Sequence, residues 1–295
     1  MTVCLPNEPC IVNSEQQRRL TDEFLNGYLS YIENLFIAIR RQLDRYLRQA
    51  KPQKLGKPYP LGQCLEISQA FERLFKQLKP SSFNVPEHEI ACQAIQDFLL
   101  AGGKFRQVWG DLRGEYFQNA FTLGSLYVDV ANDTVDPNKP PVEILPFTEA
   151  NLSPIKDFFH FKRIAEQYWQ AQVLPNLLVP SLAPYFPLIV LQPNSGPQLQ
   201  GLFDYMIALT QRELFQPSEE VLKQLAFPEA LFIKACSWQE VAVQPFPMNK
   251  EQRRQAAIQT CQVAREKQDY KDRQCRDRAV QKALLVNQQW LNLRL

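Results

Sequence analysis

Residues 116–131 read YFQNAFTLGSLYVDVA, and this stretch has the pattern of a β-hairpin. Two runs rich in aromatic and β-branched residues, Glu115 to Leu123 and Leu126 to Ala131, flank the pair Gly124-Ser125. Runs of this kind are typical of strands, and a two-residue turn containing glycine joins antiparallel neighbours. The stretch therefore predicts two paired antiparallel strands.

Two neighbouring segments extend this prediction to a sheet. Lys104 to Trp109 has the same β-branched and aromatic texture, and Val142 to Leu145 is a candidate fourth strand. We expect a small central antiparallel sheet near residues 104–145.

Amphipathic helices are predicted before the sheet. Ser14 and Gln17 have capping-box spacing, and apolar residues then recur at steps of three and four from Leu20 to Tyr46, which predicts one long helix. A second helix should start near Gly62. A third should run from Pro86 to Leu100 and stop at Gly102-Gly103.

The remaining chain is predicted to be mostly helical. Ser153-Pro154 is a typical helix start. The further predicted elements are a strand at Phe186 to Leu191, helices at Leu199 to Leu214 and Ser218 to Ala226, a strand at Leu231 to Cys236, and a long polar helix from Asn249 to Asn292. The expected fold class is α+β, with a helical N-terminal layer and a long C-terminal helix. Residues 1–248 would form one domain and residues 249–295 a basic helix.

Composition predicts a globular protein of the cytoplasm. Of the 295 residues, 45% are hydrophobic and 22% charged, which argues against wholesale disorder. The N-terminal segment lacks the basic start and apolar run of a signal peptide, and prolines interrupt the most apolar segment, Pro175 to Pro193. The cysteines number seven and none are spaced as CxxC, so we expect reduced thiols rather than a disulfide framework or a zinc ribbon.

Cys64 is the candidate nucleophile of this sequence. It follows Gly62-Gln63 in a loop that leads into a helix, where free backbone N–H groups and the helix dipole favour a thiolate. Asn119 and Asp129 lie on the two strands of the hairpin. A thiol at a helix start beside polar groups on strands is the geometry of thiol acyl transfer. The simpler alternative is that Cys64 is a small buried apolar residue.

These residues carry a resemblance to a known superfamily. Gly62-Gln63-Cys64 followed by Ser68 resembles the nucleophile motif of transglutaminases, and Gly62-x-Cys64-x-Glu66 is similar to that of arylamine N-acetyltransferases. Both belong to the papain-like superfamily, so the resemblance implies a cysteine-bearing helix packed on an antiparallel sheet that carries His and then Asp. The run Leu126 to Val130 resembles the strand with the family's Asp, at Asp129. The likeness covers about a quarter of the chain.

The sequence departs from this family at the position of the catalytic base. Asn119 stands where the family has His, and an alternative alignment would place Gln107 there; neither amide accepts a proton from a thiol. A carboxylate near Cys64 without an imidazolium would raise the thiol pKa. The only histidines are His88 and His160, and neither lies on the hairpin; a structural role is expected for His160 among three phenylalanines.

Other ligand sites are not predicted. Asp129, Asp133 and Asp136 lack a second acidic cluster that would support a metal. Gly102-Gly103-Lys104 lacks the rest of a phosphate loop and reads as a helix C-cap. We therefore expect no metal and no cofactor.

Positive charge gathers at the C-terminus. Residues 249–295 hold 11 Lys and Arg against 5 Asp and Glu, a net charge of +6, whereas the rest of the chain holds 22 against 26, or −4. A narrow apolar stripe from Cys275 to Leu293 should dock this helix, with Arg265 to Arg278 exposed. The charges favour an acidic or helical partner over nucleic acid, because acids alternate with the basic residues and no aromatic platform accompanies them.

Two functions remain open at this point. The first is a papain-like or transglutaminase-like module that acts on or binds a peptide, amine or acyl substrate. If it is active, it would be a cysteine-dependent acyl transferase or hydrolase, with Cys64 as nucleophile, Asp129 as orienting carboxylate and Asn119 in the place of the base. The second is a non-enzymatic binding or scaffold protein that uses a groove and the C-terminal helix to bind a peptide or protein partner, with no membrane involved.

Overall fold

A computed structural model describes residues 4–200, 204–237, 249–291 and 293. The chain divides into two compact units, Met1–Pro154 and Ile155–Leu295. Each unit has its own hydrophobic core, one built from residues 25–142 and the other from residues 174–290. This division differs from the expected boundary at residue 248, because helices near the C-terminus supply core side chains to the second unit. The fold class is α+β, as the sequence predicts.

The first unit begins with helices. They are α1 (Ser14–Phe24), α2 (Leu29–Ala50), α3 (Cys64–Phe75) and α4 (Pro86–Leu100), with a two-stranded ladder of β1 (Gln53–Lys54) and β2 (Lys57–Pro58) between α2 and α3. The prediction of one long helix from Ser14 is wrong, because a 3-10 turn at Asn26–Tyr28 separates α1 from α2. The helix predicted from Pro86 to Leu100 is α4, and it has the bounds that Pro86 and the glycine pair predict.

The predicted capping box at Ser14 is also wrong. Asn13 is the N-cap residue, and no side chain caps this helix start. Gln17 is instead buried, its Nε2 donating to the Gly102 carbonyl at 3.2 Å and its Oε1 accepting from the Lys104 N–H at 2.8 Å. Gln17 therefore ties α1 to the chain between α4 and the sheet.

The sheet of the first unit is antiparallel, in the order β6-β5-β4-β3-β7. Its strands are β3 (Phe105–Leu112), β4 (Tyr116–Leu123), β5 (Leu126–Asp129), β6 (Glu143–Pro146) and β7 (Leu152–Ser153), with the short helix α5 (Phe147–Ala150) before β7. Leu123 pairs with Leu126 across Gly124-Ser125, so the predicted hairpin is confirmed. The expected helix start at Ser153 is wrong, because Ser153 pairs with Asp111 of β3.

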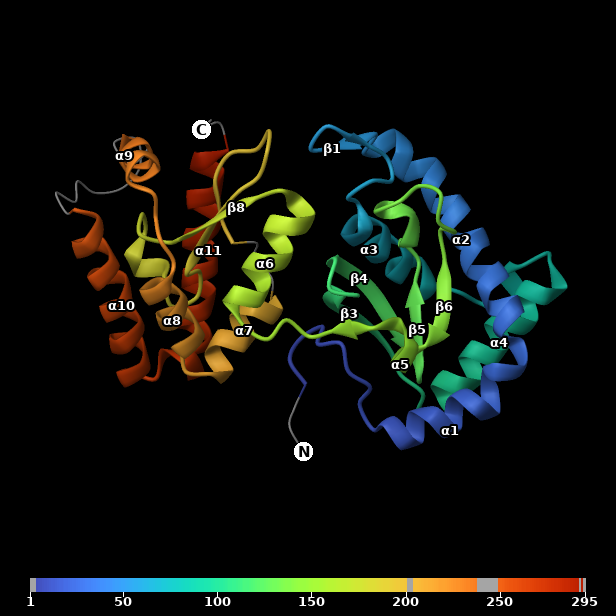
Figure 1. The fold of residues 1–295 in the computed structure, drawn as a ribbon. Coiled ribbons are helices and arrows are strands. Elements are labelled where there is room, and N and C mark those ends of the chain that lie inside the picture. The colour runs from blue at the N-terminus through green and yellow to red at the C-terminus, as the bar shows by residue number, and fades with distance from the viewer. Residues whose placement is uncertain (1–3, 201–203, 238–248, 292, 294–295) are drawn as a thin grey trace. The chain divides into compact units, whose positions relative to one another are not determined.

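Helices α2, α3 and α4 cover one face of this sheet (Figure 1). Phe121 and Val128 form a strand pair and both lie in the core with Phe36 and Phe71 of the helices. The Phe36 and Phe71 rings meet edge to face at 5.1 Å between centroids. Fully burying a phenylalanine side chain contributes about 2–3 kcal/mol, so this contact is a main link between the helices and the sheet.

A buried arginine fastens α2 to the chain after β5. Arg40 is fully buried, and its guanidinium binds both carboxylate oxygens of Asp133, at 2.9 and 3.1 Å, as well as Asp44 and the Val130 carbonyl. Asp44 also accepts a hydrogen bond from the Tyr59 hydroxyl. Asp133 is therefore one half of a bidentate ion pair.

The second unit is mixed in structure. Its helices are α6 (Phe158–Trp169), α7 (Asp204–Arg212), α8 (Gln216–Gln224), α9 (Glu229–Ser237), α10 (Lys250–Glu266) and α11 (Arg273–Trp290), and its antiparallel sheet has the order β10-β9-β8, formed by Gln198–Leu199, Leu188–Leu191 and Gln172–Pro175. The predicted strand at Leu231 to Cys236 is wrong, since those residues lie in α9. The predicted strand near Leu188 is confirmed.

The C-terminal stretch forms two helices where one was expected. A 3-10 turn at Asp269–Lys271 separates α10 from α11. Ala279, Ala283 and Trp290 of the predicted apolar stripe are buried in the core of this unit, with Val286 and Leu293 packed against it. Among the described helices, none combines the length and the hydropathy that a membrane crossing requires. Residues 201–203 of the predicted helix Leu199 to Leu214, residues 238–248, residue 292 at the end of the predicted C-terminal helix, and residues 294–295 lie outside the described residues.

Candidate functional site

Cys64 is the first residue of α3, where the sequence predicts it. Its side chain is 9% exposed, and the Asn119 Nδ2 atom of β4 lies 3.5 Å from the Cys64 sulfur as a hydrogen-bond donor. One turn further along α3, the Ser68 hydroxyl donates to the Asn119 carbonyl at 3.2 Å. Two hydrogen bonds therefore fix α3 on β4 at this point.

The environment of Cys64 holds the proton on the thiol. Burial raises the pKa of Cys64, and the hydrogen bonds from Asn119 oppose that shift without reversing it. Lys54, which also favours the thiolate, is paired with Glu66 at 2.9 Å. An amide hydrogen bond stabilises a thiolate but cannot remove the thiol proton. The thiol is therefore predominantly protonated at neutral pH.

Asp129 lies on the opposite face of the sheet from Asn119. Phe121 and Val128 form a pair and share a face, and side chains alternate along each strand. Asn119 is two residues from Phe121 and thus on that face, whereas Asp129 directly follows Val128 and points the other way. The two strands are adjacent and antiparallel, as expected, but their register keeps Asp129 out of the Cys64–Asn119 pair.

Asp129 belongs to a separate buried network. Gln118 Nε2 and the Tyr127 hydroxyl donate to its Oδ2 at 2.6 and 3.0 Å, and the Ala131 N–H donates to its Oδ1 at 2.8 Å. Burial is the largest influence and raises the pKa of Asp129 to about 6, although these three hydrogen bonds favour the charged form. The sequence reading missed Gln118. The signal was present, because the two-residue turn at Gly124-Ser125 places Gln118 and Asp129 on one face.

The remaining candidates lie on β3, α4 and α6 rather than beside Cys64 at the start of α3. Gln107 pairs with Phe121 and is half-buried. His88 lies in the first turn of α4, with its ring 6.0 Å from Phe83. His160 belongs to the second unit, where its N–H donates to the Asp157 carboxylate at the N-cap of α6 and its Nδ1 accepts from the Lys156 N–H. Gly102 has φ +96°, and the Gly103 N–H donates to the Phe98 carbonyl, which fits the predicted C-cap.

The expectation that the chain lacks disulfides is wrong at one place. Cys4 and Cys10 form a disulfide, while the other five cysteines are free. A turn in which the Glu8 N–H donates to the Leu5 carbonyl brings the two cysteines together. The Glu8 carboxylate lies near both sulfurs, within 4.8 Å, and accepts from the Leu5 N–H at 2.7 Å. With both sulfurs in the disulfide, this cluster offers no thiolate ligand to a metal.

Comparison of the chain with protein-family models, with curated proteins and with solved structures gives no match.

Proposed function

We propose that the first unit is a divergent papain-like or transglutaminase-like module that binds a peptide, amine or acyl ligand without catalysing a reaction on it. The observation that carries this proposal is the pairing of Cys64 with the amide of Asn119, 3.5 Å away, where a catalytic site of this kind needs a base.

The surroundings of Cys64 support binding over catalysis. Thiol acyl transfer needs a thiolate, an imidazole that takes the proton, and a group that orients the imidazole. The thiol pKa is raised, and the carboxylate of Asp129 is engaged by Gln118 and Tyr127 on the other face of the sheet. The helix, the sheet and their contact through Ser68 remain as a scaffold.

Partner binding through the basic C-terminal helices is the alternative, and two internal contacts weaken it. Arg254 donates to the carbonyls of Leu222 and Leu225 at the end of α8, and Arg265 forms an ion pair with Glu219. These two arginines therefore bind groups within the second unit. Arg273 and Arg278 are exposed, with Arg273 3.8 Å from the Asp277 carboxylate and Arg278 donating to the Cys275 sulfur, and they are the arginines that an acidic peptide or protein would contact. A cytoplasmic location stays a prediction, which the Cys4–Cys10 disulfide opposes because thiols are kept reduced there.

Hydrolysis of an activated ester tests the absence of catalysis. We expect the whole chain and its Cys64→Ala variant to hydrolyse p-nitrophenyl acetate at the same slow rate, with no initial burst. A burst of about one equivalent of p-nitrophenol that disappears in Cys64→Ala would show a functional acyl-enzyme and contradict the proposal.

A further inference from the structure

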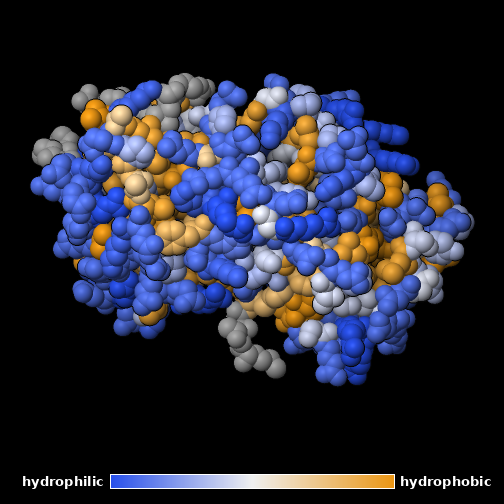
Figure 2. All heavy atoms as spheres, in the orientation of Figure 1, coloured by the Kyte–Doolittle hydropathy of each residue, from blue (hydrophilic) through white to orange (hydrophobic). Residues whose placement is uncertain are grey.

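The C-terminal half of α2 carries three arginines on one face, Arg41, Arg45 and Arg48, which form the arginine stripe. They follow one another at steps of four and three residues, so about 5–6 Å separates successive Cβ atoms. All three residues are exposed, whereas Leu43 and Leu47 on the opposite face of α2 are buried. The surface over this end of α2 is strongly hydrophilic (Figure 2). The arginine stripe therefore faces solvent.

The charge of the arginine stripe is not neutralised by ion pairs within the described part of the chain. None of the three arginines has a carboxylate at ion-pair distance there. Asp44 is the nearest acid along α2, and it is bound by the buried Arg40 at 2.7 Å and by the Tyr59 hydroxyl at 2.5 Å. The stripe therefore presents three positive charges in a row.

Helix stability does not account for this arrangement. The dipole of a helix favours cations at its C-terminus, but the effect is confined to the last turn, where Arg48 lies. Arg41 and Arg45 are like charges at positions i and i+4, a spacing that destabilises a helix. A ligand that carries several negative charges along its length would remove this repulsion. The stripe is therefore suited to a polyanion.

One further cation lies beside the end of the stripe. Lys57, on β2, is exposed, and within the described residues it has no carboxylate partner. Its ladder partner Lys54 is instead paired with Glu66 at 2.9 Å. The guanidinium of Arg48 lies 5.7 Å from the centroid of the ring of Tyr59, the residue that follows β2. This contact places the ladder beside the last arginine, so the positive surface extends from α2 to β2.

The surroundings of the stripe distinguish between the classes of polyanion. An anionic membrane surface binds a helix through its apolar face, and the apolar face of α2 is buried in the core of the first unit. A protein partner needs a desolvated apolar centre, whereas the exposed residues beside the arginines are Gln42 and Gln49. Tyr46 lies further round the helix, so the stripe itself holds no ring on which unpaired bases could stack.

We propose that the arginine stripe, together with Lys57, binds the phosphate backbone of a nucleic-acid duplex without reading its sequence. Phosphate contacts and the release of counterions are sufficient for binding of this kind, and arginine binds phosphate through two parallel hydrogen bonds. The surface does not include the Cys64–Asn119 pair. The inference therefore goes beyond the proposed function and does not depend on it.

Fluorescence anisotropy of the whole chain with a labelled DNA duplex of about 20 base pairs tests the proposal. We expect a Kd in the micromolar range at about 50 mM salt, equal for duplexes of different sequence. Four phosphate contacts predict that the affinity falls about a hundredfold between about 50 and 200 mM salt. No binding of the duplex, or binding that does not depend on salt, would overturn the proposal.

Competition identifies the class of polyanion. Unlabelled duplex of another sequence should displace the labelled duplex as well as the original sequence does. A single strand of the same length should compete about threefold more weakly, because its charge density is lower. A polyglutamate peptide and phosphatidylserine vesicles should compete at least about tenfold more weakly at equal charge. Stronger competition by the single strand, the peptide or the vesicles would overturn the assignment to a duplex.

A double variant locates the site. Arg41→Gln together with Arg45→Gln should weaken duplex binding at least about tenfold and lower the slope of log K against log salt by about two. Arg273→Gln together with Arg278→Gln removes the same charge from the second unit and should weaken binding by less than about twofold. Equal losses in the two double variants would show that binding follows net charge, and would overturn the assignment to the stripe.

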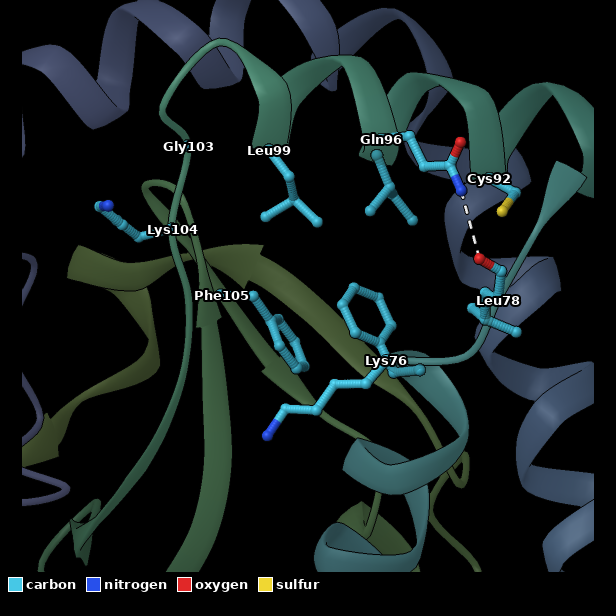
Figure 3. Close-up of a pocket in the computed structure, with 10 residues that line it drawn as sticks. Lys76, Leu78, Cys92, Gln96, Leu99, Gly103, Lys104 and Phe105 are labelled. Carbon is cyan, nitrogen blue, oxygen red and sulfur yellow. Dashed lines mark hydrogen bonds between the residues drawn. The ribbon is translucent and has the colours of Figure 1, made fainter.

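Single variants separate charge from position. Arg45→Lys keeps the charge and should retain affinity within about threefold, whereas Arg45→Gln should lower the salt slope by about one. Lys76→Gln is the matched control, because Lys76 is exposed but paired with Glu72 at the groove between α3, α4 and β3 (Figure 3). It should leave the slope unchanged. A loss in Arg45→Lys as large as in Arg45→Gln, or a loss in Lys76→Gln, would contradict the proposal.

Discussion

The side-chain amide of Asn119 lies 3.5 Å from the sulfur of Cys64, and this contact joins the start of α3 to the middle of β4. Thiol acyl transfer would need an imidazole in the place of this amide. The contact preserves the packing of helix on sheet, because Ser68 binds the backbone of the same residue. At Asn119, the packing of α3 on β4 is therefore maintained without a group that can take the thiol proton.

Asn119→His should make Cys64 more reactive. An imidazole beside the sulfur can take its proton and form a thiolate–imidazolium pair. We expect alkylation of Cys64 by iodoacetamide at pH 7 to become about tenfold faster, a change of about 1.4 kcal/mol in the barrier. The gain should stay modest because Asp129 faces away from the pair and cannot orient the ring. Asn119→Ala is the control and should give no gain. Equal rates in the histidine and alanine variants would show that the amide is not what limits the thiol.

Asp129 should make stability depend on pH. Its pKa is raised from 3.8 to about 6 in the folded protein by burial, so the folded state binds the proton more tightly than the unfolded state. The stabilisation by protonation is complete below about pH 4 and is lost as the pH rises through 6. This amounts to about 2–3 kcal/mol.

Asp129→Asn removes this titration. Relative to the unchanged chain, the variant should therefore gain about 2–3 kcal/mol in unfolding free energy between pH 4.5 and pH 8, as measured by urea denaturation. Asp22→Asn, at an exposed carboxylate, serves as the control and should show little such trend. A difference between Asp129→Asn and the unchanged chain that stays constant with pH would mean that Asp129 is charged throughout.

Trp290 should be a main anchor of α11 on the second unit. Its side chain is 2% exposed and lies in the core of that unit, whereas Leu285 on the same helix is 60% exposed. Trp290→Ala should lower the unfolding free energy by about 3–5 kcal/mol, and Leu285→Ala by less than about 0.5 kcal/mol. Chemical denaturation measures both.

Deletion of residues 249–295 should expose the same core and reduce solubility. A truncated chain as soluble and heat-stable as the whole would contradict the docking of this stripe.

The elements that the sequence predicts well carry local signals. Pro86 at the first helical position and the glycine pair after Leu100 mark both ends of α4, and Gly124-Ser125 marks the hairpin. The break at Asn26–Tyr28 was missed because the apolar spacing continues across it. Leu231 to Cys236 is a short apolar run, and such a run is compatible with either a strand or a buried helix. In the structure these residues form part of α9.

The sequence predicts where the candidate site residues lie along the chain, but not the face of the sheet on which Asp129 lies or the burial of Cys64. Cys64 at a helix start and Asn119 on a neighbouring strand follow from local pattern, and the structure brings them together. The face on which Asp129 lies depends on strand register, since a shift of one residue reverses every side chain. Burial of the Cys64 thiol depends on packing from many segments, which a motif does not contain.

The pH dependence of Cys64 alkylation shows whether Cys64 is an activated nucleophile or an unreactive buried thiol. The rate of iodoacetamide labelling at Cys64, followed by peptide mass spectrometry from pH 5 to 10, reports the pKa of this thiol and its intrinsic reactivity. We expect labelling at neutral pH no faster than that of an ordinary exposed thiol, and a midpoint of the pH–rate curve above that of an ordinary thiol, because burial raises the pKa of Cys64. Fast and selective labelling of Cys64 with a midpoint below pH 7 would contradict it and would identify the first unit as an active thiol enzyme.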